Sequence, residues 1–360
     1  MNTREEIKKL WRESFNDSDE FVDMFFSRVY NDDDALLLTR QEGGAPVSAM
    51  LLQRYRLKFH DSEPGLAYVC GAATRRSERG KGHMSTLMIH ALEEARSRGD
   101  AFCALIPAHS WLYPYYSRFG FRSVFLVRDD RYTALHPFNQ EEGDYEAVDN
   151  PFDETVYEAF TRLEHLEPCR VLHSRRDFLN ILDDVRLDGG AVAIIASPER
   201  DGRIVAMAWG VERDGMVRVT ELLGETEADR IAALRRLRRD FPGLPFTVGV
   251  VPRGGGLDNR RRLSPRGMCR VVNVLTVLEA IAQAHPRWRS RIRVTDRLLS
   301  ENSHFYVAAA GRVTVDDECT DMPDLDIDIE TFTSLVFSSP EIGSITGLPS
   351  VRPAISLMLD

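Results

Sequence analysis

Residues 73–88 read ATRRSERGKGHMSTLM, where two glycines and a group of positive charges separate an apolar segment from an amphipathic one. The apolar run that ends at Thr74 predicts a buried strand. The apolar spacing from Gly82 to Arg98 predicts a helix, and Gly99 is placed to end it. Positive side chains at the start of a helix oppose the helix dipole, so we expect a negatively charged group to bind at this junction.

The glycines and the charges of this junction suit a particular anion. Gly80 and Gly82 would let main-chain N–H groups approach a ligand without an intervening Cβ. Arg79 and Lys81 add full positive charges, and together these groups fit a pyrophosphate. Glycine turns before helices are common, so an ordinary turn also explains the spacing. Neither a dinucleotide-binding GxGxxG turn nor a GxxxxGK[ST] phosphate loop occurs here.

Length and charge limit the possible partners. A chain of 360 residues predicts more than one domain, since single cores rarely exceed roughly 250–300 residues. The formal charge of −10 disfavours a nucleic-acid partner and suits a cationic substrate, although acidity for solubility alone explains it too. The five scattered cysteines form no CxxC or Cys/His cluster, so the sequence predicts no metal site. The charged N-terminus and the lack of a spanning apolar run predict a cytoplasmic protein without a membrane span.

Three parts follow one another along the chain. Residues 1–138 alternate predicted helices and strands, which favours a mixed sheet with helices on its faces. The predicted helices include one over residues 21–30 and a short aromatic one that Pro114 is expected to break. Residues 139–252 repeat the order of strands, helix and strand, but the corresponding junction reads ELLGETEADR and offers no evident anion site. Residues 253–360 begin with the basic, glycine-rich RGGGLDNRRRL and continue with a helix and alternating strands.

The first part resembles the GNAT N-acetyltransferases in its order of apolar strand, basic glycine turn, helix, strand and aromatic helix ending YYSRFGF. Residues 79–84, RGKGHM, resemble their pyrophosphate motif [QR]xxGx[GA], although Met84 replaces the usual small residue and makes the helix start bulkier. The full chain resembles the Eis (enhanced intracellular survival) acetyltransferases, most specifically between residues 66 and 125. The resemblance implies an α/β (α+β) fold of two GNAT domains with mixed sheets, the second without cofactor, and a C-terminal sterol-carrier-protein-like domain.

The resemblance also implies acetyl-CoA as co-substrate and a role for individual residues. Its pantetheine would lie beside Ala72, Ala73 and Thr74, and its pyrophosphate would be held by Arg79, Gly80, Lys81, Gly82, His83 and Met84. Tyr116 stands at the general-acid position, where a phenol can protonate the departing thiolate. Packing on the sheet is the alternative for Tyr116, and it is the favoured explanation for Tyr113 and Tyr115. His83 and His109 are weaker candidates, as a phosphate or surface residue and as a helix cap.

A catalytic base is missing where many GNAT enzymes carry a glutamate, because YVCGAAT contains no acid. In Eis proteins the terminal carboxylate is the base, so the resemblance implies this role for Asp360. The apolar tail RPAISLMLD would then pack inward through Ile355, Leu357 and Leu359, and an ordinary edge strand is the alternative. A carboxyl pKa of about 3.5 is low for a base, so positioning or a water relay would have to contribute.

We therefore expect an N-acetyltransferase that moves the acetyl group of acetyl-CoA directly to a primary amine, such as a polyamine, an aminoglycoside or a lysine side chain. The first two helices line the acceptor cleft in such folds, which suggests Phe25, Phe26 and Tyr30, although core packing explains these residues nearly as well. Eis-like proteins are often hexamers, so a homo-oligomer is expected. The alternative is a lipid- or small-molecule-binding protein that uses its C-terminal domain and carries a non-catalytic GNAT scaffold.

Overall fold

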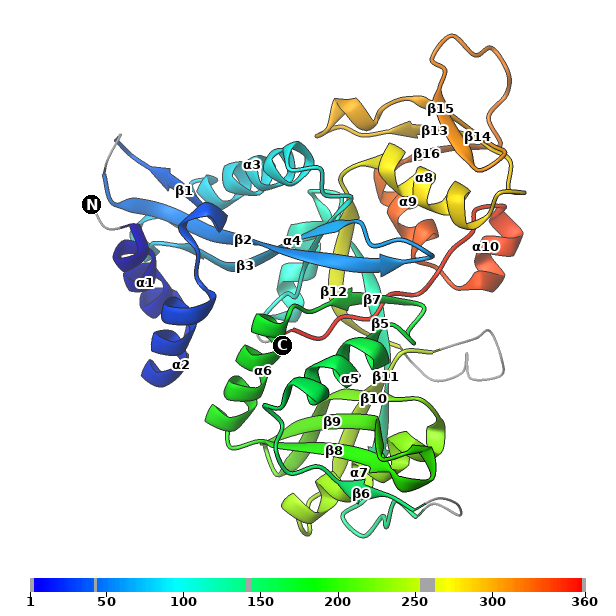
Figure 1. The fold of residues 1–360 in the computed structure, drawn as a ribbon. Coiled ribbons are helices and arrows are strands. Elements are labelled where there is room, and N and C mark those ends of the chain that lie inside the picture. The colour runs from blue at the N-terminus through cyan, green and yellow to red at the C-terminus, as the bar shows by residue number, and fades with distance from the viewer. Residues whose placement is uncertain (1–2, 42–43, 140–143, 253–262, 358–360) are drawn as a thin grey trace. The chain divides into compact units, whose positions relative to one another are not determined.

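The computed structural model describes residues 3–41, 44–139, 144–252 and 263–357 (Figure 1). The chain forms two compact units. Unit 1 contains the described residues up to Leu126 together with Pro265–Pro353, and unit 2 contains Val127–Pro252, the short piece ending at Ser264 and the tail from Ala354. Unit 1 thus draws on the predicted first and third domains, and the predicted domain boundaries stay a prediction.

The first sheet of unit 1 has the strand order β1-β2-β3-β4-β12. Only β3 and β4 run parallel in this series, and the other neighbouring pairs are antiparallel. The strands are β1 (Ala35–Thr39), β2 (Pro46–Phe59), β3 (Gly65–Thr74), β4 (Phe102–Leu105) and β12 (Ser264–Val271). The helices of the same region are α1 (Thr3–Ser14), α2 (Asp19–Met24), α3 (His83–Ser97) and α4 (Tyr113–Ser117). The mixed α/β fold predicted from the sequence is confirmed.

Helix α3 packs one apolar face against the core of this region. The face consists of the buried side chains Leu87, Met88, Ala91, Leu92 and Ala95, which recur at helical spacing. Each fully buried leucine or methionine contributes about 1.5–3 kcal/mol relative to an exposed one. Gly99 ends the helix as predicted, with a φ of +80° and its N–H bonded to the Arg96 carbonyl at 2.9 Å.

Two predicted helices differ in detail. The helix expected over residues 21–30 is α2 followed by a π-helical turn, Phe25–Val29. Pro114 was expected to break the aromatic helix, but it stands in the first turn of α4. A proline is tolerated there because the first-turn N–H groups have no partner within the helix.

The remainder of unit 1 holds a second sheet with the order β15-β14-β13-β16. Its strands are β13 (Ser290–Thr295), β14 (Phe305–Ala309), β15 (Arg312–Val315) and β16 (Leu325–Asp328). The accompanying helices are α8 (Val274–Ala284), α9 (Ile329–Val336) and α10 (Pro340–Thr346). The likeness of the C-terminal region to a sterol carrier protein stays a prediction.

The strands of unit 2 are hydrogen-bonded in the order β5-β11-β10-β9-β8-β6. They are β5 (Arg122–Tyr132), which begins in unit 1, β6 (Glu146–Ala147), β8 (Ala191–Ser197), β9 (Arg203–Arg213), β10 (Met216–Gly224) and β11 (Phe246–Val250). The helices are α5 (Glu154–Glu164), α6 (Arg175–Leu187) and α7 (Glu227–Asp240), and the short strand β7 is Cys169–Leu172.

The tail joins unit 2 through main-chain hydrogen bonds to β7. The Ala354 N–H donates to the Cys169 carbonyl at 2.9 Å, and the Val171 N–H donates to the Ala354 carbonyl at 3.1 Å. Ile355 and Leu357 are buried, as the inward-packing hypothesis requires. Leu359 and Asp360 lie outside the described residues. Among the helices that the structure describes, none is long and apolar enough to cross a membrane.

Candidate functional site

Strand β3 separates from its parallel neighbour before it ends. The pairing of β3 with β4 stops at Val69, opposite Leu105, whereas β3 itself continues to Thr74. On the other side, a single β2 residue between Ala49 and Leu51 stands against two β3 residues, 71 and 72, which marks a β-bulge in β3 at Gly71. Gly71 has a φ of +59°, and a Cβ there would stand 2.3 Å from the Trp11 ring, so only glycine fits. The end of β3 therefore presents a main-chain edge that β4 does not cover.

The predicted glycine turn follows this edge. Gly80 and Gly82 have φ values of +80° and +85°, and a Cβ at either position would meet nothing within 4 Å. Gly82 is the N-cap of α3 and supplies no side-chain cap. Among the described residues, no side chain therefore caps the first-turn N–H groups of α3, and the space beside the two glycines is open. Uncapped N–H groups at a helix N-terminus are a common binding site for anions.

Glu78 is the common hydrogen-bond partner of several basic side chains at the turn. Its carboxylate is nearly inaccessible and accepts hydrogen bonds from Arg40 and from Lys81, the latter at 3.2 Å. His83 Nε2 lies 3.2 Å from the same carboxylate. Burial raises the pKa of Glu78, but the hydrogen bonds from Lys81, Arg40 and His83 outweigh it and leave the pKa below its ordinary value. The carboxylate thus stays ionised and fixes Lys81 and His83 at the turn.

Arg79 and Met84 contact parts of unit 1 other than the Glu78 carboxylate. Arg79 Nε donates to the Thr74 carbonyl at 3.1 Å, which ties the turn to the end of β3. Ser48 Oγ donates to the Ala73 carbonyl at 3.0 Å and lies 2.9 Å from Thr74 Oγ1. The Met84 side chain packs against the core under α3, so this bulky residue leaves the space at the two glycines open.

Tyr116 lies on α4, which contacts the first turn of α3. The hydroxyl oxygens of Tyr115 and Ser85 are 3.4 Å apart, and these residues belong to the two helices. The Tyr116 ring is packed against Tyr115 and Phe121, and 8% of the residue is exposed. Burial raises the pKa of Tyr116 to about 12, with a smaller contribution from Tyr115. Among the described residues, none hydrogen-bonds the Tyr116 hydroxyl, which therefore remains protonated and able to donate.

The corresponding junction of unit 2 is chemically different. Helix α7 starts at a Thr226 N-cap, whose hydroxyl accepts from the Asp229 N–H, while the Asp229 carboxylate accepts from the Thr226 N–H. Asp229 is buried and also bonds Arg200 and Tyr145. A carboxylate of the chain itself thus occupies the start of this helix. The absence of a cofactor site in this part of the chain stays a prediction.

The comparisons with known proteins agree with this geometry. Residues 2–124 match the family described as an acetyltransferase (GNAT) domain. The part of the chain that this match covers is called the GNAT domain below. Its class as an acyltransferase, predicted from the sequence, is confirmed, and the GNAT fold implies the use of acetyl-CoA.

Solved structures resemble the chain over nearly its whole length. A probable N-acyltransferase of unknown function from Enterococcus faecalis V583 is 17% identical with a TM-score of 0.77, covering 98% of this chain and 96% of that one. Eis1 from Mycobacterium abscessus is 15% identical with a TM-score of 0.70, covering 99% and 94%. A GCN5-related N-acetyltransferase from Kribbella flavida is 15% identical with a TM-score of 0.71, covering 98% and 94%. At these identities the likeness shows the fold. No curated protein matches the sequence.

The other residues predicted for the GNAT domain lie apart from the turn or outside the described chain. Phe25, Phe26 and Tyr30 are buried, and Phe25 and Phe26 pack around Trp11, so their part in acceptor binding stays a prediction. His109 precedes a short 3₁₀ turn (Ser110–Leu112), gives it no side-chain cap and stacks on the exposed Trp111. Asp360, the predicted base, is not among the described residues.

Two features of the GNAT domain escaped the sequence analysis. Glu78 sits among the basic residues of the turn, and a lone acid in a basic stretch could have been read as their internal partner. Gly71 could have been noticed as a glycine inside an apolar strand, which is a signal for a bulge.

Proposed function

We propose that the chain transfers the acetyl group of acetyl-CoA directly to a primary amine, with Tyr116 as general acid. One observation carries the proposal: an uncapped glycine turn at the N-terminus of α3 lies next to the helix that bears a buried, protonated tyrosine. The turn supplies donors for a diphosphate, and the tyrosine supplies a proton for a leaving thiolate. These are the two things that a thioester donor needs from an enzyme.

The residues present fit the donor. The open space at Gly80 and Gly82 leaves room for phosphate oxygens beside main-chain N–H groups. Lys81, half exposed and held by Glu78, adds a positive charge that a diphosphate can share. The edge of β3 at Ala72–Thr74, which β4 leaves uncovered, would pair with the amides of the pantetheine and polarise the thioester carbonyl.

The chemistry is an acyl transfer in which protons balance. The amine nitrogen, as free base, attacks the thioester carbon and forms a C–N bond, and the C–S bond then breaks. The amine loses one proton and the sulfur gains one, so the products are a neutral amide and the free thiol. Tyr116 donates to the departing sulfur, where negative charge develops.

The acidity of Tyr116 sets the timing of that step. A thiol has a pKa of about 8.5, and the Tyr116 pKa is about 12, so full proton transfer to a thiolate is uphill by roughly 5 kcal/mol. The phenol therefore acts as a hydrogen-bond donor to sulfur until the C–S bond is nearly broken. Attack by the amine leaves a positively charged nitrogen in the tetrahedral intermediate. A separate base must remove a proton from this nitrogen before the neutral amide can form.

We assign the base to the terminal carboxylate of a chain that ends at Asp360, on the resemblance to Eis proteins. The burial of Ile355 and Leu357 supports the inward packing of the tail on which this proposal depends. The acidic chain, with a formal charge of −10, suits an amine acceptor that carries further positive charges, and Phe25, Phe26 and Tyr30 remain candidates for its contacts. A homo-oligomeric assembly is proposed on the same resemblance.

The test is a thiol-release assay with acetyl-CoA and a panel of polyamines, aminoglycosides and lysine peptides. We expect turnover with at least one polycationic amine. Acetyl-CoA should also raise the temperature of unfolding, as any ligand of the folded state does, whereas fatty acids and sterols should not. Stabilisation by fatty acids or sterols alone, without thiol release from any amine, would support the lipid-binding alternative and contradict the proposal.

A further inference from the structure

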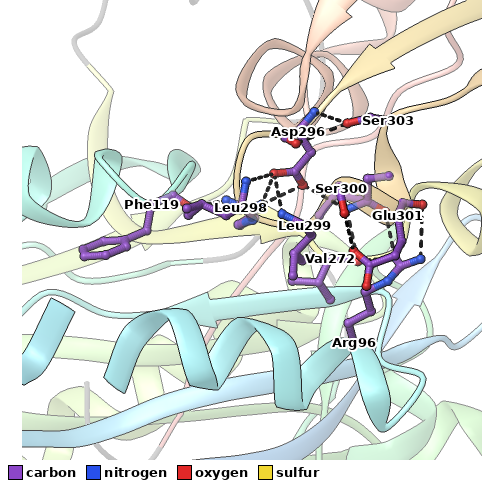
Figure 2. Close-up of polar contacts among 12 residues, drawn as sticks. Arg96, Phe119, Val272, Asp296, Leu298, Leu299, Ser300, Glu301 and Ser303 are labelled. Carbon is purple, nitrogen blue, oxygen red and sulfur yellow. Dashed lines mark hydrogen bonds and ion pairs between the residues drawn. The ribbon is translucent and has the colours of Figure 1, made fainter. Parts of the chain in front are cut away.

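A buried ion pair lies behind the helix that carries Tyr116. The Arg270 side chain on β12 is 1% exposed, and the Asp296 side chain is fully inaccessible. Arg270 Nη2 donates to both Asp296 oxygens, at 2.6 and 2.7 Å (Figure 2). Asp296 also accepts from the N–H groups of Leu298 and Leu299, at 3.0 and 3.1 Å, and from Asn302 Nδ2 at 3.0 Å. The carboxylate is therefore held by five hydrogen bonds and cannot turn away from the guanidinium.

The other end of the guanidinium reaches the end of α4. Arg270 Nη1 donates to the carbonyl of Phe119, which lies two residues beyond Ser117, the last residue of α4. The Phe119 N–H in turn donates to the Tyr116 carbonyl at 2.9 Å. Phe119 is thus the one residue that links the buried ion pair to the main chain of Tyr116.

Gly120 is fitted to this contact. Its φ is +85°, and a Cβ at this position would stand 2.4 Å from Arg270 Nη1. Its N–H closes the end of α4 on the Ser117 carbonyl at 3.1 Å. The guanidinium therefore takes the place of a side chain at residue 120, and the turn after α4 is shaped around it.

A gain in stability does not by itself explain why the Arg270–Asp296 ion pair is buried here. Removing two charges from water costs several kcal/mol per ion, and apolar residues of similar volume often stabilise a core as well or better. A planar guanidinium does provide a fixed direction, because it bonds two acceptors in one geometry. The Tyr116 ring is held only by packing, since none of the described residues bonds its hydroxyl. The direction of α4 therefore decides where its phenol lies.

We propose that Arg270, oriented by Asp296, is a positioning residue for Tyr116. It fixes the end of α4 through the Phe119 carbonyl and so sets the place of the phenol relative to the donor thioester. The inference rests on the proposed function, because it gives Tyr116 a role in the reaction. Strand β12 is placed for this role because it pairs with β4 in the same sheet.

A second arginine provides a matched control. Arg96 lies in the last turn of α3, and its Nη1 donates to the Val272 carbonyl at 2.9 Å and to Asn302 Oδ1 at 2.8 Å. Its Nη2 donates to the Glu301 carbonyl at 3.2 Å. Arg96 thus binds the same segment around Asp296 and Asn302 (Figure 2 shows Arg96 beside Val272 and Glu301), but within the described part of the chain it forms no hydrogen bond or ion pair with α4. Its loss should weaken the fold without moving Tyr116.

The experiment compares Arg270→Met with Arg96→Met in the full chain, after both variants are shown to be folded by circular dichroism and thermal melting. We expect kcat to fall at least tenfold in R270M, with the KM for acetyl-CoA within twofold of wild type. In R96M both constants should stay within twofold. Gly120→Ala displaces the guanidinium but keeps both charges, so it should lower kcat in the same way as R270M. G120A is used as the test variant if R270M does not fold.

A second readout does not depend on turnover. In protein labelled with ¹³Cζ-tyrosine, the Tyr116 signal is assigned from its absence in Tyr116→Phe and followed against pH. We expect its chemical shift and titration to change in R270M or G120A and to match wild type in R96M. Equal losses of kcat in R270M and R96M, or an unchanged kcat and Tyr116 signal in R270M, would overturn the inference. Failure of the proposed function looks different: wild type itself would release no thiol, while the signal still reports on the position of Tyr116.

Discussion

Replacing Gly82 with alanine separates what the backbone needs at the turn from what the ligand needs. A Cβ at Gly82 would meet no atom within 4 Å, so the cost in the free protein comes only from the φ of +85°. An L-residue in the left-handed region costs roughly 1–2 kcal/mol. Gly99, at the other end of α3, has a φ of +80° and is equally free of neighbours. Gly82→Ala and Gly99→Ala should therefore destabilise the free protein by similar amounts.

The two variants should differ once acetyl-CoA is added. The new Cβ at residue 82 would lie where phosphate oxygens approach the main chain, and we expect at least tenfold weaker binding, or about 1.4 kcal/mol. At a concentration of 100 times the wild-type Kd, acetyl-CoA stabilises wild type by about 2.7 kcal/mol. A tenfold weaker complex is stabilised at that concentration by about 1.4 kcal/mol. Gly99→Ala should show the full wild-type gain.

The assay is thermal or chemical unfolding of each protein over a series of acetyl-CoA concentrations, with desulfo-CoA or CoA as a second ligand that keeps the diphosphate. A selective loss in Gly82→Ala supports the turn as the diphosphate site. Equal stabilisation of both variants by acetyl-CoA would refute the reasoning, because the ligand would then make no demand on residue 82.

Three further predictions concern single groups. Tyr116→Phe should lower kcat about 100-fold or more in the thiol-release assay and leave the stabilisation by acetyl-CoA unchanged. Because the pKa of Tyr116 is raised to about 12, the phenol loses its proton only as the pH rises toward that value. A loss of activity at high pH centred near 9 would therefore contradict the assignment of Tyr116 as general acid. Two residues added after Asp360 should abolish turnover but not acetyl-CoA binding, and normal turnover would exclude the terminal carboxylate as base. Glu78→Gln should lower the free energy of unfolding by about 1–3 kcal/mol. Lys81→Ala removes a half-exposed partner of Glu78 and should lower it by less than about 1 kcal/mol. Equal losses of the two variants in urea unfolding would mean that Glu78 does not hold the basic side chains of the turn together.

Local sequence was sufficient for the elements that depend on near neighbours. The glycines of the turn, the amphipathic face of α3 and the Gly99 stop each depend on residues within a few positions, and all were predicted. Pro114 was misjudged because its effect depends on whether it falls in the first turn or the interior of a helix.

Long-range partners could not be predicted in the same way. The contact of Arg270 with Phe119 joins residues 151 positions apart, and nothing near either one indicates the other. The bulge at Gly71 depends on Trp11 from a separate helix, and only the folded chain brings the two together. Tyr116 was singled out from the sequence by resemblance, whereas its burial and its position beside α3 required the structure.

The most direct measurement is a crystal structure of the chain with acetyl-CoA or CoA bound. The account predicts diphosphate oxygens within hydrogen-bond distance of main-chain N–H groups between Gly80 and Met84, and the sulfur within reach of the Tyr116 hydroxyl. A donor bound elsewhere, or bound at the turn with its sulfur directed away from Tyr116, would contradict it.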